Sequence, residues 1–335
     1  MSRLLSTVSA ITFIAGTYAS ADVPKVVADI APIHSLVSRV MDGVGEPKLI
    51  VPNETSPHDY RLRPADAEAI EDANLVFWMG EGLTPWMERA LEALSNDTDI
   101  IEFLALEEST LLSFREGALF EAHDHSDHDD HDDHDDHDDH DDHDKDHDDH
   151  DDHDDHDDHA GHDHGEYDPH AWLSTNNAKT WLNVIAARLS SIDPDNAGAY
   201  FANASEARGE MDALDVEINA MLDPVRGGKF VVFHDAYQYF ETVYDFPASG
   251  AISLGDASDP SAARVAEIAN RIKSENIACV LSEPQFNAGL VKTVMGGTDA
   301  TTEVIDPLGF GIEPGKSLYP KLIRAMAQSL VNCLK

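Results

Sequence analysis

Positive charge is scarce in this sequence of 335 residues, which contains 22 Lys and Arg against 65 Asp and Glu, for a formal net charge of −43. A nucleic-acid interface needs clustered Lys and Arg to neutralise phosphates, so nucleic acid is excluded as a partner. The sequence also lacks the Gly-x-x-x-x-Gly-Lys-Ser/Thr, His-Glu-x-x-His and Gly-x-Ser-x-Gly motifs. We therefore expect neither ATP hydrolysis nor the two hydrolase chemistries that these motifs support.

Long apolar runs are also missing. The first residues contain Arg3, a short apolar stretch at residues 4–15, and the small residues Ala19 to Ala21. This order is typical of a secretory signal peptide, so we predict that residues 1–21 are removed. No later segment reaches the ~18 uninterrupted apolar residues of a membrane span, and we expect a soluble, exported mature protein.

Only two cysteines occur, Cys279 and Cys333. In an oxidising compartment they can pair, and closing a loop of this length stabilises the fold by at most roughly 4 kcal/mol. We predict this disulfide. The alternative is two buried free thiols, which mass spectrometry without reductant would reveal.

A histidine-aspartate ribbon, which begins at His123 and ends at His164, interrupts the chain. Between residues 121 and 166 there are 23 Asp, 2 Glu and 1 Lys, a net charge of −24 out of the −43 of the whole chain. The Asp-Asp-His repeat has a period of three, which fits neither a helix nor a strand, and it has no apolar side chain to bury. We predict a disordered, solvated loop at about residues 121–166. Imidazoles alternating with carboxylates favour metal capture over a merely solubilising acidic run.

On both sides of the ribbon, apolar strands alternate with amphipathic helices. Before it we expect strands at residues 26–30, 48–51, 75–78 and near 100, and helices at residues 33–41, 64–73 and 84–94. After it we expect strands at residues 230–233, 251–254, 278–281 and 302–305, and helices at residues 236–243, 261–275, 288–295 and 317–333. This alternation predicts an α/β fold with parallel sheets covered by helices on both faces.

Two helices separate these halves. One is expected from an N-cap at Ser174 to about residue 192, and a longer one from Pro194 to Leu222. We predict two Rossmann-like lobes, residues 22–193 (including the ribbon) and residues 224–335. Residues 194–223 would join them as a long rigid helix, unlike a flexible Gly/Ser hinge.

Four polar residues form a candidate metal site. His58 and His234 follow predicted strands, Asp306 follows another, and His170 precedes a helix. Ligands bind beyond the carboxyl ends of parallel strands, so a cleft between the lobes could gather all four. Three imidazoles and one carboxylate suit tetrahedral Zn²⁺.

Each of these residues has a structural alternative. A lone histidine at a strand end is more often a hydrogen-bonded structural residue, and Asp306 before a proline could be a turn-former. Their shared placement favours the metal site. The remaining histidine outside the ribbon, His34, has no similar partner, and we interpret it as structural.

Five separated motifs carry a resemblance to a known family. In chain order they are Ser56-Pro57-His58-Asp59-Tyr60-Arg61-Leu62-Arg63-Pro64-Ala65-Asp66, Asp168-Pro169-His170-Ala171-Trp172-Leu173, Val232-Phe233-His234-Asp235-Ala236-Tyr237, Glu283-Pro284-Gln285-Phe286 and Asp306-Pro307-Leu308-Gly309. With the ribbon and the two cysteines, the sequence closely resembles the ZnuA family. These are periplasmic zinc-binding components of bacterial high-affinity ABC uptake systems, within the metal-specific cluster of solute-binding proteins.

The resemblance implies two α/β lobes linked by a rigid helix, with zinc buried in the cleft between them. The family's three histidine ligands correspond here to His58, His170 and His234, and its nearby carboxylate corresponds to Asp306. Relatives that carry manganese or iron usually have an acid at the third position. An imidazole there shifts the preference from Mn²⁺ toward Zn²⁺.

One position departs from the pattern of some zinc-binding relatives. They have a glutamate beside the first histidine that can serve as a fourth ligand, whereas this chain has Pro57. The fourth position then falls to Asp306, which we favour, or to water. Glu283 is expected either to orient a ligand histidine or to form an ordinary surface salt bridge.

The expected function is periplasmic capture of Zn²⁺ and its delivery to an inner-membrane ABC permease with a cytoplasmic ATPase. We expect a monomer, with a periplasmic zinc metallochaperone as a further partner. The ribbon histidines, from His123 to His164, are expected to form secondary, low-affinity sites. One rival is a zinc hydrolase, because three histidines with an open position also describe a catalytic site. The other rival is a secreted zinc buffer or adhesin that serves no transporter.

Overall fold

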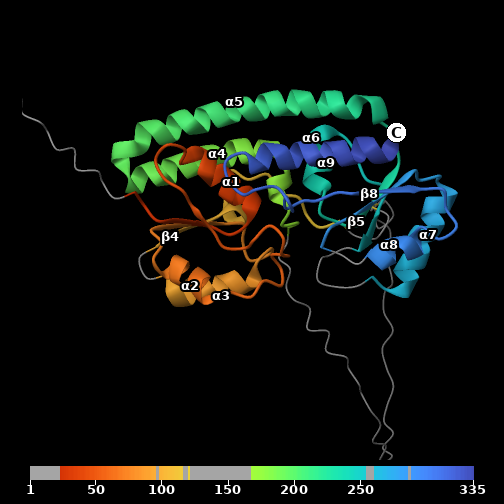
Figure 1. Cartoon of the computed structure of the whole chain (residues 1–335), viewed down its shortest axis with the longest axis horizontal. Coiled ribbons are helices and arrows are strands. Elements are labelled where there is room, and N and C mark those ends of the chain that lie inside the picture. Colours follow the sequence, from red (N-terminus) through yellow and green to blue (C-terminus); the bar gives the residue numbers. More distant parts are fainter. Residues whose placement is uncertain (1–22, 96–97, 116–119, 121–166, 254–259, 286–287) are drawn as a thin grey trace, which may run out of the picture.

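The computed structural model describes residues 23–95, 98–115, 120, 167–253, 260–285 and 288–335. Figure 1 shows two α/β halves side by side beneath one long helix. The α/β fold class with two parallel sheets is confirmed.

Two predictions from the sequence fall on other residues. The predicted signal peptide, residues 1–21, lies outside the described residues. So does the whole ribbon, including its first histidine, His123, and its last, His164. The low-affinity zinc sites expected from His123 to His164 therefore stay a prediction.

The first half contains a four-stranded parallel sheet in the order β2-β1-β3-β4. Its elements are β1 (Val26–Ala28), α1 (Ala31–Val40), β2 (Lys48–Leu49), α2 (Pro64–Glu71), β3 (Leu75–Trp78), α3 (Pro85–Leu94) and β4 (Asp99–Glu102). The fully apolar strands β1 and β3 lie at the centre of the sheet and are buried, as parallel strands covered on both faces should be.

The second half repeats this topology, with the sheet order β6-β5-β7-β8 and every pair parallel. Its elements are β5 (Phe230–His234), α6 (Gln238–Tyr244), β6 (Ala251–Ser253), α7 (Ala262–Ser274), β7 (Cys279–Ser282), α8 (Ala288–Val294), β8 (Thr301–Val304) and α9 (Leu318–Leu334). In each sheet the strand order reverses between the two central strands. A ligand crevice is expected at that switch point, outside the carboxyl ends of the strands.

The long helix between the halves is α5 (Ala197–Leu222), and it runs beside α4 (Thr175–Ile192), as Figure 1 shows. The N-cap of α4 is Ser174, as predicted, whose hydroxyl accepts the Asn177 N–H at 3.2 Å. Helical structure begins at Pro194, as predicted, but its first turn, Pro194–Asn196, is a 3₁₀ helix and α5 itself begins at Ala197. The Asp193 carboxylate accepts hydrogen bonds from Asn196 and Tyr200 at this start.

One face of α5 is buried at helical spacing, through Tyr200, Ala204, Ala207, Met211, Leu214, Ile218 and Leu222. Burying a large apolar side chain stabilises the fold by about 1.5–3 kcal/mol, so this face holds the helix in place. A polar contact adds to it. The Asp215 carboxylate of α5 accepts hydrogen bonds from Thr175 of α4 (2.6 Å) and Tyr244 of α6 (2.9 Å), which joins α5 to both halves.

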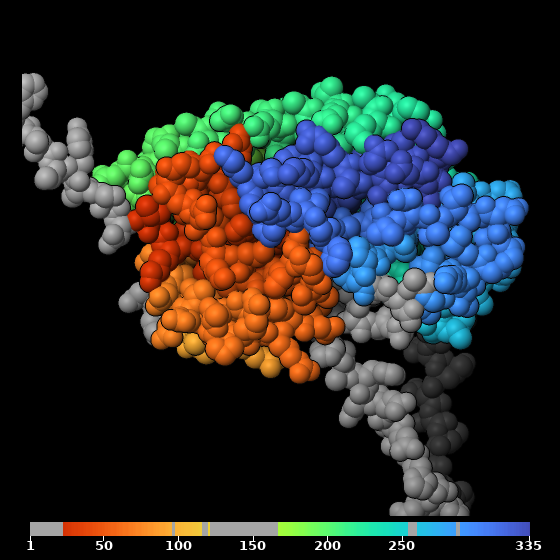
Figure 2. Space-filling view, in the orientation of Figure 1, coloured from red at the N-terminus to blue at the C-terminus, as the bar shows by residue number. Residues whose placement is uncertain are grey.

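The closing helix α9 also connects the halves, since it packs against α1 and α5. In the space-filling view of Figure 2, the blue segment around the start of α9 lies directly against the red and orange surface of the first half. The Tyr319 N–H donates to Ser35 Oγ of α1 (2.9 Å), and its hydroxyl donates to the Trp172 carbonyl (2.8 Å). A continuous apolar core therefore extends from the first half into the second. The lobe boundaries predicted from the sequence stay a prediction.

The predicted disulfide is present and joins Cys279, at the start of β7, to Cys333 in α9, with a Cα–Cα distance of 5.5 Å. It ties the closing helix to the second sheet. Among the described helices, none combines the length and apolar character that crossing a membrane requires.

Candidate metal centre

A narrow cavity of about 20 Å³ lies between residues of the two halves. Ser56, Pro57, His170 and Trp172 line it from the first half, and His234, Glu283, Gln285, Pro307 and Leu308 line it from the second. A volume of this order holds about one water molecule or one ion.

His170 is positioned by the carboxylate two residues before it. The Asp168 Oδ1 atom accepts both the His170 backbone N–H (3.0 Å) and its ring Nδ1–H (2.7 Å), and both residues are buried. The 3₁₀ helix Ala171–Leu173 follows directly. With the proton on Nδ1, the lone pair is on Nε2, which is the form of imidazole that ligates metals.

His234 has the same arrangement in the second half. It is the last residue of β5, and its ring Nδ1–H donates to Glu283 Oε1 at 2.5 Å. Glu283 directly follows β7, so the pair lies at the switch point of the second sheet. Glu283 is buried and directed toward a histidine, which is the first of the two roles considered for it.

His58 approaches from the loop after β2. The loop is held by Trp86 of α3, whose indole N–H donates to the Pro57 carbonyl at 2.8 Å. On its other side, the Tyr60 hydroxyl donates to the buried Asp66 carboxylate at 2.6 Å. These contacts place the loop at the cavity and keep its entry and exit in a defined conformation.

The three rings are neighbours. The ring centroids of His170 and His234 are 5.3 Å apart, and those of His58 and His170 are 6.2 Å apart. Two imidazoles on one tetrahedral Zn²⁺, with Zn–N near 2.0–2.1 Å, place their centroids about 5 Å apart. The first pair matches that spacing, and His58 stands about 1 Å too far out. In the part of the chain that the structure describes, no three His, Cys, Asp or Glu side chains already have a metal-holding arrangement.

Comparison with known proteins identifies the family. Residues 26–333 match the sequence model of ZnuA, described as "Zinc-uptake complex component A periplasmic". The chain belongs to the ZnuA family.

Members of the ZnuA family from two bacteria resemble the chain over nearly its full length. The high-affinity zinc uptake system protein ZnuA of Brucella abortus (strain 2308) is 48% identical over 337 residues, which cover 100% of this chain and 99% of that protein. The protein of the same name from Paracoccus denitrificans is 46% identical over 317 residues, covering 94% and 93%.

Solved structures agree with this ZnuA fold. A crystal structure of ZnuA has a TM-score of 0.69 at 22% identity and covers 94% of this chain and 100% of its own. The laminin-binding protein Lmb of Streptococcus agalactiae, described as bifunctional with adhesin and metal transporting activity, has a TM-score of 0.69 at 20% identity, covering 93% and 100%. At these identities the likeness concerns the fold.

Asp306, the carboxylate expected near the ZnuA site, is half-buried after β8. Its Oδ1 atom accepts the Leu308 N–H at 2.9 Å, so it shapes a turn, which was its structural alternative. Burial raises the pKa of this carboxyl, and the backbone N–H groups of Leu308, Gly309 and Phe310 oppose that rise. Asp306 thus directly precedes Pro307 and Leu308, which line the cavity, while its carboxylate accepts an N–H group of its own loop.

Two first-half side chains hold the Asp306 loop. No sequence pattern indicated Asn53, and Trp172 belongs to a family motif but had no predicted role. The Asn53 amide donates to the carbonyls of Gly309 (2.5 Å) and Ile312 (2.8 Å), and the Trp172 indole N–H donates to the Pro307 carbonyl (2.8 Å). Asp168 was also given no role, although its spacing of two residues from His170 was visible. His34 lies outside the site, with its Nε2 atom 3.0 Å from the Pro47 carbonyl, which fits the structural role expected for it.

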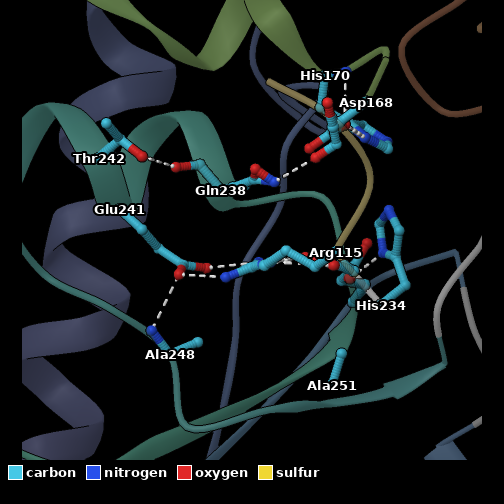
Figure 3. Close-up of polar contacts among 12 residues, drawn as sticks. Arg115, Asp168, His170, His234, Gln238, Glu241, Thr242, Ala248 and Ala251 are labelled. Atoms are coloured by element: carbon cyan, nitrogen blue, oxygen red, sulfur yellow. Dashed lines mark hydrogen bonds and ion pairs between the residues drawn. The ribbon is translucent and has the colours of Figure 1, made fainter. Parts of the chain in front are cut away.

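A cluster of charges beside His234 was missed as well (Figure 3). Arg115 forms ion pairs with Asp235, the next residue after His234, and with Glu241 of α6. Burial raises the pKa of both carboxyls, and the guanidinium opposes that rise by stabilising their charged forms. Arg115 thus donates hydrogen bonds to two buried carboxylates at once, those of Asp235 and Glu241.

Proposed function

We propose that this chain is the periplasmic zinc-binding component of a zinc uptake system and that it binds one Zn²⁺ ion through His58, His170 and His234. One observation carries the proposal. His170 and His234 come from different halves, each has its Nδ1–H bonded to a buried carboxylate, and their rings are 5.3 Å apart at a cavity of ion size.

Each carboxylate has a definite task in capture. Asp168 and Glu283 hold the ring orientation and the Nδ1–H tautomer, and their negative charge increases the basicity of Nε2. These two imidazoles form a preorganised pair. Binding then requires His58 to move inward by about 1 Å, a shift that fits its position on a loop rather than on a strand.

We favour Asp306 for the fourth position, with water as the alternative. The carboxylate would have to give up part of its contact with the Leu308 N–H or bind through its second oxygen. Because Asn53 and Trp172 hold the loop from the first half, only a small displacement is available. A carboxylate that can move only slightly fits a site that binds a single ion.

Zinc is the cargo of the protein rather than a resident cofactor. We propose that the loaded protein, a monomer, docks on an inner-membrane ABC permease with its cytoplasmic ATPase, and that a periplasmic zinc metallochaperone is a further partner. Residues 22–193 and 224–335 would act as the two lobes, with residues 194–223 as their stiff connector. Release then requires the lobes to separate the ligands of the first half from His234.

The rival zinc hydrolase is less well supported. Such an enzyme needs a fourth position open to water and space for a substrate beside the metal. The cavity has a volume of about one ion, and two apolar residues, Pro307 and Leu308, are among those that line it. A secreted zinc buffer remains the other rival, and zinc-limited growth of a deletion strain would distinguish it from an importer component.

The test of the proposal is a competition titration with a zinc chelator, followed by anomalous diffraction from zinc-loaded crystals. We expect one tight ion with His58, His170 and His234 around it. An anomalous peak elsewhere, with these rings directed at different solvent, would contradict the proposal.

The ribbon requires a separate test, because we propose that its histidines, from His123 to His164, hold zinc weakly. Deleting residues 123–164 should remove the additional, weakly held zinc equivalents and leave one tight ion, as counted by equilibrium dialysis at several free zinc concentrations. Loss of the tight ion as well would show that the two kinds of site are not independent.

A further inference from the structure

Residues 112–115, which we call the strap, contact both the segment that carries His170 and the ligand loop of the second half, which begins at Asp235 directly after His234. On one side the strap pairs with the segment before His170. Ser113 forms an antiparallel bridge with Tyr167, and the Leu112 carbonyl accepts the Asp168 N–H at 2.9 Å. The carboxylate of this same Asp168 orients the His170 ring.

On its other side the strap is bonded to the second half. Arg115 Nε lies 3.0 Å from each carboxylate oxygen of Asp235, and Arg115 Nη1 donates to Glu241 Oε2 at 2.7 Å (Figure 3). The Ser113 carbonyl accepts a hydrogen bond from the Gln238 side chain at 3.0 Å. Asp235 is joined to His234 by a peptide bond, so these contacts reach the second ligand loop.

A tyrosine closes this set of contacts. The Tyr239 hydroxyl of α6 accepts the Leu112 N–H at 3.0 Å and donates to the Asp168 carbonyl at 2.8 Å. The strap is therefore bonded to both ligand loops, and those loops also meet through Tyr239. These hydrogen bonds fix the relative positions of residues that are more than 100 positions apart in the sequence.

Arg115 is the charged member of this arrangement. Its side chain is 18% exposed, and those of Asp235 and Glu241 are 6% and 5% exposed. The planar guanidinium donates to both carboxylates in a fixed fork, which a flexible ammonium group cannot reproduce. Removing it would leave two buried carboxylates facing each other without the cation that now joins them.

We propose that Arg115 is a positioning residue that sets the distance between His170 and His234. This inference rests on the proposed zinc site. Metal ligands need to be held within about 0.5 Å of their working geometry, and supporting contacts outside the ligand shell typically change metal affinity by about 10–100-fold. Arg115 supplies such support from the first half to the ligand loop of the second.

The experiment measures zinc affinity and melting temperature of the full mature chain, with a chelator holding free zinc so low that only the tight site fills. Arg115→Met should weaken that site by about 10–100-fold. Arg115→Lys keeps the charge but lacks the fork, and should weaken it by a smaller factor. With one equivalent of Co²⁺ in place of zinc, the visible spectrum of both variants should differ from that of the unmodified chain, because the ligand geometry has changed.

A charge-matched variant separates positioning from simple stability. Arg115→Met combined with Glu241→Gln leaves the cluster with the same net charge as in the unmodified chain. It should recover much of the melting temperature that Arg115→Met loses, while zinc affinity stays low. Wild-type zinc affinity in this double variant, or in Arg115→Lys, would overturn the inference.

Arg39 offers a matched control. Its side chain is 14% exposed and contacts Glu210 (2.6 Å) and Glu206 (3.5 Å) of α5. Arg39→Met should lower the melting temperature without changing zinc affinity more than about twofold, and an equal loss of affinity there would count against a specific role for Arg115. If the unmodified chain itself has no tight ion, the proposed function fails, whereas a tight site indifferent to Arg115 refutes only the inference.

Discussion

The two sheets share one topology but use their switch points differently. In the second sheet, the crevice between β5 and β7 holds His234 and Glu283, a carboxylate bonded to an imidazole. In the first sheet, Asp29 lies at the corresponding switch point between β1 and β3, and its carboxylate accepts the backbone N–H groups of Ile30 and Met79, both at 2.7 Å. Both carboxylates are buried.

The difference lies in what each carboxylate holds. Asp29 binds backbone at the ends of two strands, so its effect should be confined to the stability of the first half. Glu283 accepts a hydrogen bond from His234, a ligand in the proposed zinc site, so its effect should appear in zinc affinity. In the proposed zinc site, the ligands of the first half are His58 and His170, which lie in loops outside the sheet. The two sheets thus share one topology, and the proposal assigns a metal ligand to the switch point of the second sheet alone.

The largest effect is expected from removing the imidazole at the functional switch point. His234→Ala should weaken tight zinc binding by more than about 100-fold, which exceeds the usual effect of an outer-shell change. His34→Ala, the control, removes a half-buried histidine outside the site and should leave zinc affinity nearly unchanged. Competition titration measures both, and equal affinities in the two variants would refute the assignment of His234.

Exchanging the carboxylate beside that imidazole should have the next largest effect. Glu283→Gln keeps the shape but removes the charge that holds the Nδ1–H of His234, so zinc affinity should fall by about 10–100-fold. The melting temperature of the metal-free protein should change less than in the corresponding Asp29 variant. If affinity is retained and only stability falls, Glu283 is equivalent to Asp29 and the contrast between the sheets disappears.

Asp29→Asn should have the opposite pattern to Glu283→Gln, with a loss of stability and little change in zinc affinity. An Asn side chain has one acceptor oxygen, so either the Ile30 or the Met79 N–H would face an amide NH₂ group. A buried donor left in this way costs about 1–3 kcal/mol of unfolding free energy, measurable by chemical denaturation of the metal-free protein. Zinc affinity should stay within about threefold of the unmodified chain, and a tenfold loss would mean that the first switch point is also part of the binding machinery.

Much of the fold could be foreseen from the sequence, because strand and helix periods are local. The apolar run at residues 75–78 coincides with β3, and the rings of His58 and His234 both lie close to that of His170. The contrast between the two switch points was not foreseen, because no sequence pattern indicated a role for Asp29. The disulfide followed from there being only two cysteines in a chain predicted to be exported.

What could not be foreseen are contacts between distant polar residues. Arg115 and Asp235 are 120 positions apart, and Asn53 and Gly309 are 256 apart. Nothing local distinguishes these residues from ordinary surface residues, because their partners are chosen by the packing of the two halves. The strand predicted at residues 26–30 ends at Ala28. Beyond it, the Asp29 side chain accepts the backbone N–H groups of Ile30 and of the distant Met79.

The smallest effect is a pH dependence specific to Asp29. Burial raises the pKa of its carboxyl to about 7 in the folded protein, against 3.8 for an ordinary aspartate, while the N–H groups of Met79 and Ile30 act in the opposite direction. Between these values the folded state keeps a proton that the unfolded chain has released. The contribution of Asp29 to stability is therefore complete below about pH 4 and is lost as the pH rises through about 7.

The unfolding free energy of the metal-free chain, relative to that of Asp29→Asn, should accordingly fall by about 1 kcal/mol between about pH 6 and about pH 7.5. Because the histidines and other carboxyls are common to both proteins, the subtraction isolates Asp29. A constant difference over this range would mean that the two backbone donors hold the carboxylate ionised throughout. The first switch point would then carry a permanent buried charge, whose counterpart in the second half is the Glu283 carboxylate bonded to His234.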